Sequence, residues 1–116
     1  MAIGDLSIEQ RTDGGVLVLE LRGELDIATA ATLAQTVARV EGQRLVLDLC
    51  RITVLDSVGV RALLHTRRWM VNHGGEARFV CDTGPAARTI ELMGLRDALG
   101  VCADVATAQA ELGGAR

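Results

Sequence analysis

The stretch that decides the fold runs from Arg44 to Gly59 and reads RLVLDLCRITVLDSVG. Its first part, residues 44–50, carries large aliphatic side chains almost without a polar break. Such a run is typical of a strand that is covered on both faces by helices. We therefore place residues 44–50 in the middle of a sheet, and Asp56-Ser57-Val58-Gly59 where the loop after that strand meets a helix.

The sequence before this stretch predicts a hairpin and a helix. Strand-like runs at 6–11 and 16–22 flank a turn at 12–15 with two adjacent glycines, which is typical of a β-hairpin. Apolar residues then recur at steps of three and four between residues 30 and 40, with Thr29 in the N-cap position. This change of period predicts an amphipathic helix.

The sequence after the stretch alternates helices and strands. A helix is expected over 57–72, a strand over 77–81 and a third helix from Pro85. A short apolar run at 98–102 predicts another strand, and a last helix follows over 104–112, capped by its first residue. The sequence therefore predicts an α/β domain with a mixed sheet and the order β-β-α-β-α-β-α-β-α.

The helix expected over 57–72 has two different faces. An apolar stripe that should pack on the sheet consists of Val60, Leu63, Leu64, Met70 and Val71. A basic and polar face that should meet solvent consists of Arg61, His65, Arg68 and Asn72.

Length and charge limit the classes of function. The 116 residues, 49% of them hydrophobic, suit one domain over 1–116, ordered from about residue 5 to 112 with a frayed tail at 113–116. The net charge of −3 is spread along the chain, which argues against nucleic acid as a direct partner. Because no apolar run approaches the roughly 20 residues that span a bilayer and the start lacks a signal-peptide pattern, we expect a cytoplasmic protein without a membrane partner.

The cysteines predict structural thiols. Cys50, Cys81 and Cys102 are odd in number, have no Cys-x-x-Cys spacing and lie in or beside apolar runs. Free cysteine is among the most buried residue types. We therefore expect reduced, half-buried side chains, with no metal site and no cofactor.

Three carboxylates raise the alternative of an acid–base enzyme or a magnesium site, namely Glu24, Asp26 and Asp56. Such chemistry needs a pocket, and the sequence has no Gly-x-Ser-x-Gly elbow, Walker-type loop or Cys/His metal spacing. The sequence therefore predicts a protein that is not an enzyme.

Ser57 is the residue at which regulation is expected. A phosphate on a hydroxyl at a helix start would face unpaired backbone N–H groups and the positive end of the helix dipole. It would also add about 1.5 to 2 negative charges beside Asp56 and repel a partner docked over the helix. The alternative is structural, since Asp-Ser is also an ordinary N-capping pattern and Gly59 would then only allow close packing.

A set of motifs in register along residues 5–112 resembles the STAS domain of bacterial anti-sigma factor antagonists. The motifs are Gly23-Glu-Leu-Asp26, Leu45-Val-Leu-Asp-Leu49, Leu55-Asp-Ser-Val-Gly59, Gly74-Gly75, and Pro85 followed by Leu92-Met-Gly-Leu95. The resemblance implies a single STAS-type domain. It also implies that the unphosphorylated protein binds an anti-sigma factor with serine kinase activity and so releases the sigma factor.

The same resemblance implies roles for individual residues. Ser57 would be the phosphorylated serine, and Asp26, Asp56 and Gly59 would be its neighbours. The expected partner-binding residues are Glu24, Val58 and Arg61.

Two of these residues depart from the family pattern. Many relatives carry Ser or Thr at the position of Val58. With valine there, Ser57 is the one hydroxyl of this motif that can accept a phosphate. Arg61 stands where relatives often have a small residue. One helical turn beyond Ser57, it would pair with a phosphate or an acidic partner, or it is a solvated helix arginine.

Alternatives and further partners stay open at this point. A non-switching STAS scaffold subunit of a transport or signalling assembly would use Ser57 only as a cap. A nucleotide-binding module is a third reading, although the sequence offers no phosphate loop. A serine phosphatase that resets the switch is a second expected partner. An acidic surface and a complete set of covering helices favour a monomer when unbound.

Overall fold

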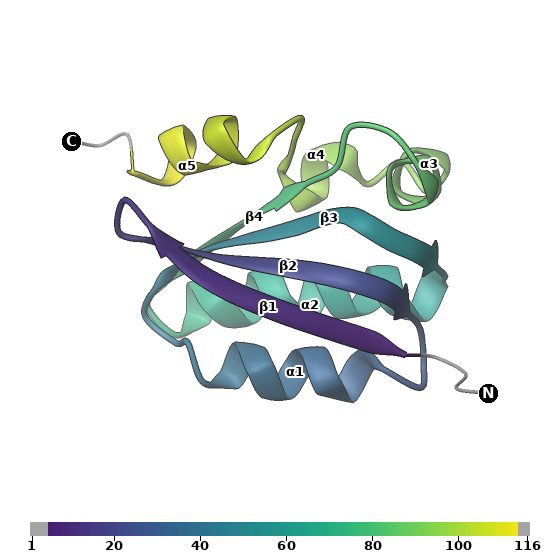
Figure 1. Ribbon diagram of the computed structural model, residues 1–116, viewed down its shortest axis with the longest axis horizontal. Coiled ribbons are helices and arrows are strands. Elements are labelled where there is room, and N and C mark those ends of the chain that lie inside the picture. The colour runs from purple at the N-terminus through teal and green to yellow at the C-terminus, as the bar shows by residue number, and fades with distance from the viewer. Residues whose placement is uncertain (1–4, 114–116) are drawn as a thin grey trace.

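A computed structural model describes residues 5–113 and shows a five-stranded sheet between helices (Figure 1). The strands are β1 (Leu6–Asp13), β2 (Val16–Leu25), β3 (Arg44–Leu55), β4 (Glu76–Val80) and β5 (Val101–Cys102). The helices are α1 (Ala30–Ala38), α2 (Ser57–Asn72), α3 (Pro85–Leu92), α4 (Arg96–Leu99) and α5 (Val105–Gly113). The strands lie in sequence order, with β1 antiparallel to β2 and the other neighbours parallel. The predicted α/β class with a mixed sheet is confirmed.

β1 and β2 form the predicted hairpin. Asp13 pairs with Val16, so the turn consists of Gly14 at φ +62 and Gly15 at φ +79. Positive φ at both central positions fits the twist of a hairpin and carries no steric cost for glycine. Both strands are longer than the sequence predicts, and β2 continues to Leu25.

β3 is the central strand, as predicted. Leu45 and Leu47 are buried in the larger part of the core, and Val46 is buried in a second cluster. Neighbouring residues of a strand point to opposite faces, so this segment is covered on both sides.

The predicted end of β3 is wrong. The strand does not stop at Cys50 but runs to Leu55, so the single residue Asp56 separates it from α2 in place of a loop. Two register shifts against β2 insert extra residues into β3. Such bulges change the phase of the side chains, so that Ile52 and Leu55 are buried while Val54 is exposed. The sequence therefore shows no regular strand period here.

Helices cover the two faces of the sheet unequally. α1 and α2 lie along one face, where Leu33, Val60 and Leu63 join the larger core cluster. α5 crosses the other face and packs its Ala108 and Leu112 into the second cluster. The predicted cap of α5 is confirmed, because the Thr107 N–H donates to the Asp104 carboxylate at 2.7 Å.

The C-terminal part differs from the prediction in two details. The run 98–102 is not one strand, because residues 96–99 form α4 and Gly100 ends that helix at φ +66. The chain therefore has one helix more than predicted between its fourth and fifth strands. Gly113 belongs to α5 rather than to a frayed tail, and residues 114–116 lie outside the described residues.

Burial corrects two further expectations. Val71 is 57% exposed, whereas the other residues of the predicted apolar stripe are buried or half-buried. All three cysteines are free thiols, but Cys50 is exposed while Cys81 and Cys102 are buried. A side chain at a helix surface and one on a bulged strand depend on neighbours that the sequence does not specify.

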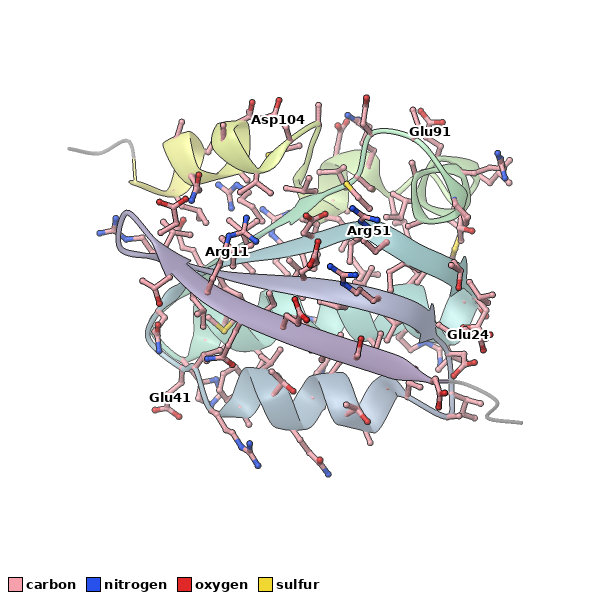
Figure 2. All side chains as sticks on the ribbon, in the orientation of Figure 1. Arg11, Glu24, Glu41, Arg51, Glu91 and Asp104 are labelled. Carbon is pink, nitrogen blue, oxygen red and sulfur yellow. The ribbon has the colours of Figure 1, made fainter. Side chains whose placement is uncertain are left out.

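The face of the sheet that carries α5 is only partly covered. Beyond α5, strands β1 and β3 present the charged side chains of Arg11 and Arg51 (Figure 2). Glu9, Glu20 and Arg22 share this face, because they lie at two-residue steps from these residues or opposite them in the sheet register. Arg22 forms an ion pair with Glu20 at 2.9 Å. The expected complete set of covering helices is therefore wrong, and the monomeric state stays a prediction.

Candidate functional site

The start of α2 is capped by Asp56. This residue has an extended backbone, and its carboxylate accepts a hydrogen bond from the Gly59 N–H at 2.8 Å. An acidic side chain in this position satisfies one of the free donors of the first helical turn. Ser57 is the first residue of the helix and is exposed. The capping role belongs to Asp56, which leaves the Ser57 hydroxyl available.

Gly59 allows α2 to press against the end of β2. A Cβ atom on this residue would lie 2.2 Å from the Leu25 carbonyl oxygen and 2.7 Å from the Leu55 Cδ1 atom. Real Cβ atoms do not approach so closely, so only glycine fits without a shift of backbone. The close contact brings the segment after Leu25, which contains Asp26, beside the first turn of α2.

The segment that carries Asp26 is held by a buried threonine. Thr29 is 4% exposed, and its hydroxyl donates to the Glu24 carbonyl at 2.8 Å and accepts from the Asp26 N–H at 3.1 Å. The Asp26 carboxylate in turn accepts from the Ala28 N–H at 2.9 Å. Thr29 occupies the predicted N-cap position of α1, but its side chain does not cap that helix. Its hydroxyl fixes the loop instead.

A third segment reaches the same end of the molecule. The Thr89 hydroxyl of α3 donates to the Leu55 carbonyl at 3.1 Å, which ties α3 to the last residue of β3. Thr29 was predicted as a helix cap rather than as the residue that holds the loop, and Thr89 was not predicted, because a single threonine in a helix carries no local signal.

Exposed apolar side chains accompany these segments. Ile27 in the loop after β2 is 79% exposed, and Leu92 at the end of α3 is 82% exposed. α3 lies beside the end of β3, where Thr89 bonds to the Leu55 carbonyl (Figure 1). An apolar residue inside a predicted loop, as at Ile27, was the one signal in the sequence for this feature.

The predicted partner-binding residues lie in two places. Val58 and Arg61 line a groove of about 390 Å³ between α1 and α2. Glu24 is half-buried in β2, opposite Val54 of β3. The structure thus brings Asp26, Asp56 and Ser57 to one end of the fold, while Val58 and Arg61 line the groove between α1 and α2.

The chemistry available at Ser57 is that of an accessible hydroxyl. No side chain in the described part of the chain forms a hydrogen bond with it. His65 is eight residues further along α2, roughly 12 Å at 1.5 Å per residue, which is too far for a base. Within residues 5–113, no three His, Cys, Asp or Glu side chains gather so as to hold a metal ion. The site offers a group that can be modified and a surface around it.

Comparison with known proteins assigns the family. The model of the STAS domain matches residues 7–108. The chain belongs to the STAS domain family. The match includes every residue named above for the site, and the resemblance drawn from the motifs is confirmed.

Three relatives of this STAS chain are named anti-sigma factor antagonists. It is 31% identical over 96 residues to the anti-sigma F factor antagonist of Paenibacillus polymyxa, covering 78% of this chain and 81% of the relative. It is 36% identical over 86 residues to the anti-sigma-F factor antagonist RsfB of Mycobacterium tuberculosis, covering 70% and 68%. The crystal structure of an anti-sigma factor antagonist from Mycobacterium paratuberculosis superposes with a TM-score of 0.85 at 26% identity, covering 97% of both chains.

None of the helices between residues 5 and 113 has both the length and the apolar character needed to cross a membrane.

Proposed function

We propose that this STAS protein is an anti-sigma factor antagonist whose binding is switched off by phosphorylation of Ser57. Its unphosphorylated form binds an anti-sigma factor that is also a serine kinase, and so releases the sigma factor. The observation that carries the proposal is the exposed hydroxyl of Ser57 at the start of α2, beside two carboxylate segments and unengaged in the cap. The names of the relatives support the binding role.

The modification needs little from this chain. The kinase would transfer the terminal phosphoryl group of ATP to Ser57 Oγ, ADP would leave, and the hydroxyl proton would pass to a base of the kinase. The first N–H groups of a helix have no acceptor within the helix. The Asp56 carboxylate accepts from the Gly59 N–H, and the N–H groups of the residues before Gly59 remain for a phosphate. These donors and the helix dipole would stabilise the phosphate locally.

The switch acts on the complex rather than on the fold. A phosphate adds about 1.5 to 2 negative charges next to Asp56 and Asp26. A partner that fits the unmodified surface would then face bulk and repulsion at contact distance, which costs several kcal/mol at a buried interface. Removal of the phosphate by a serine phosphatase would restore binding. This role places the protein in the cytoplasm and gives it no catalytic activity.

Phosphorylation is tested directly with the cognate kinase. The full chain is incubated with that anti-sigma factor and ATP, and the peptides are examined by mass spectrometry. The sequence contains two serines, Ser57 and the exposed Ser7, so Ser7→Ala is a matched control. We expect labelling of the wild-type chain and of Ser7→Ala, and none of Ser57→Ala. Labelling that persists in Ser57→Ala would refute the assignment.

Binding is tested with charge variants. Ser57→Asp should weaken binding of the kinase by about 100-fold or more, which corresponds to about 2.8 kcal/mol. Ser57→Ala should leave the affinity within a factor of a few. Equal affinity of both variants would favour the alternative of a STAS scaffold subunit, in which Ser57 has no switching role.

A further inference from the structure

The groove between α1 and α2 is continuous with the site at Ser57. Its lining residues come from both helices: Ala30, Ala31, Leu33, Ala34, Val58, Arg61, Ala62, His65 and Thr66. Val58 is adjacent to Ser57, so the groove begins beside the proposed phosphate acceptor and follows α2 away from it. A partner that covers Ser57 can therefore continue into the groove.

The α1 wall is small and uncharged. No residue from Ala30 to Ala38 carries a charge, although much of the helix is exposed. Ala31 and Ala34 present only methyl groups to the groove, while Leu33 lies buried beneath. Surface helices usually carry charged and polar side chains on the face that meets solvent, and α1 has no charged side chain there. This wall is suited to close apolar contact.

The α2 wall is cationic and unneutralised. α2 contains three arginines and one histidine but no acidic residue, in a protein whose net charge is −3. The Arg67 side chain donates a hydrogen bond to the Ala98 carbonyl. Arg61 and Arg68, in contrast, are exposed and form no ion pair with any carboxylate of residues 5–113. Arg61 lines the groove, whereas Arg68 lines a separate hollow with Arg67 and Ala98, so Arg61 supplies the positive charge of the α2 wall.

The kind of occupant follows from the walls. Both walls are helices, whose backbone groups are bonded internally, so the groove cannot pair with an extended strand. It can be filled only by side chains, which is the geometry of a helix laid into a groove. The positive charge of Arg61 on one side alone favours negative charge on one flank of that helix.

We propose, on the basis of the function proposed above, that the anti-sigma factor inserts an acidic amphipathic helix into the α1–α2 groove. Its apolar face packs on the alanines of α1 and on Val58 and Ala62, and a carboxylate on its flank pairs with Arg61. This occupant also accounts for the strength of the switch. A phosphate on Ser57 would stand at the end of the groove, where an acidic helix meets it as a like charge.

The test measures the affinity of the cognate anti-sigma factor for four full-length variants. Ala34→Glu places a negative charge in the groove, and Arg61→Glu reverses the positive charge of the α2 wall. Both should weaken binding by about tenfold or more. Two matched controls introduce the same charges elsewhere: Gln35→Glu on α1 outside the groove, and Arg11→Glu on the open face of the sheet. The controls should bind within a factor of about two of wild type, and thermal unfolding should show all four folded.

The outcomes separate this inference from the proposed function. If the Ser57 variants differ as expected but the groove variants bind like wild type, the groove is not the docking site and the switch stands. If the groove variants lose binding while Ser57→Asp does not, docking stands and the switch fails. If the anti-sigma factor does not bind the wild-type chain, both fail.

Cross-linking identifies the occupant. A photoreactive phenylalanine analogue at position 34 should capture a helical segment of the anti-sigma factor that is rich in Asp and Glu. Capture of a basic or extended segment would overturn the inference. So would capture of a second copy of this chain, accompanied by a dimer in sedimentation that Ala34→Glu abolishes.

Discussion

The two halves of β3 differ in burial, regularity and role. Residues 44–49 form a regular strand whose Leu45, Val46 and Leu47 are buried on both sides. Residues 50–55 contain the bulges, keep Ile52 and Leu55 buried and leave the two residues between them exposed. The first half holds the layers of the fold together. The second half delivers the chain to Asp56 and Ser57 without an intervening loop.

This difference shows how a rigid scaffold presents a modifiable residue. In a strand that is covered on both faces, the side chains of both faces bury most of their surface in the core. A strand that is exposed on one face but still hydrogen-bonded to its neighbours can bring a functional residue to the surface in a well-defined position. If the two halves have these separate roles, loss of a buried side chain in the first half should destabilise the fold far more than loss of an exposed one in the second half.

The largest expected effect is that of Leu47→Ala in the first half. Leu47 is fully buried, so its truncation should lower the free energy of unfolding by about 2 to 5 kcal/mol. The measurement is urea denaturation followed by circular dichroism. Val54→Ala, in the exposed second half, is the control and should change the free energy by about 0.5 kcal/mol or less. Equal losses would remove the distinction between the halves.

Gly59→Ala should have the next largest effect. The new methyl group would collide with the Leu25 carbonyl, and the resulting shift of α2 should cost about 1 to 3 kcal/mol. The rate of Ser57 phosphorylation by the cognate kinase should also fall. Gly113→Ala is a matched control, because its Cβ would meet nothing nearer than 3.8 Å and should stabilise the helix by up to about 1 kcal/mol. An unchanged stability of Gly59→Ala would contradict the tight contact.

Asp56→Ala should cost about 1 kcal/mol of unfolding free energy through loss of the cap on α2. Asp56→Asn keeps an acceptor for the Gly59 N–H and should recover most of that loss. Chemical denaturation of the two variants gives the comparison. If both lose the same amount, the carboxylate charge rather than the hydrogen bond supports the helix start.

Cys50 in the second half of β3 should differ from an ordinary cysteine in its reactivity, without an effect on stability. Its thiol is partly desolvated and lies beside Asp48, which together raise its pKa from 9.0 to about 11. The thiolate fraction at pH 8 should therefore be about 100-fold below that of an ordinary cysteine, and alkylation correspondingly slow. The rate should rise as the pH approaches 11. Rapid alkylation at pH 8 would show that the exposed side chain is solvated like a free thiol.

Much of the fold could be predicted because its signals are local. The apolar run at 44–50 predicted the central strand, the Gly14-Gly15 pair predicted the turn, and the three- and four-residue steps predicted the long helices. The errors arose where local signals were absent. Bulges removed the strand period after Cys50, and α4 is only four residues long, too short to establish a helical period.

The candidate site was predicted in part for the same reason. Asp56, Ser57 and Gly59 are contiguous, and their position at a helix start can be read from the chain. Thr29 could be predicted only as a helix cap, and its bond to the Glu24 carbonyl could not be read from the sequence. Thr89 could not be predicted, since it bonds to the Leu55 carbonyl of a distant segment.

The sequence by itself determined the α/β class, the central strand, the basic face of α2 and the place of Ser57 at a helix start. These depend on residue periods and capping residues that act over a few positions. Only the tertiary structure decided that Asp26 lies beside that helix start and that α1 and α2 enclose a groove leading from Ser57. Both depend on how closely separate segments approach, and a contact such as that of Gly59 with the Leu25 carbonyl has no counterpart in the local pattern of either segment.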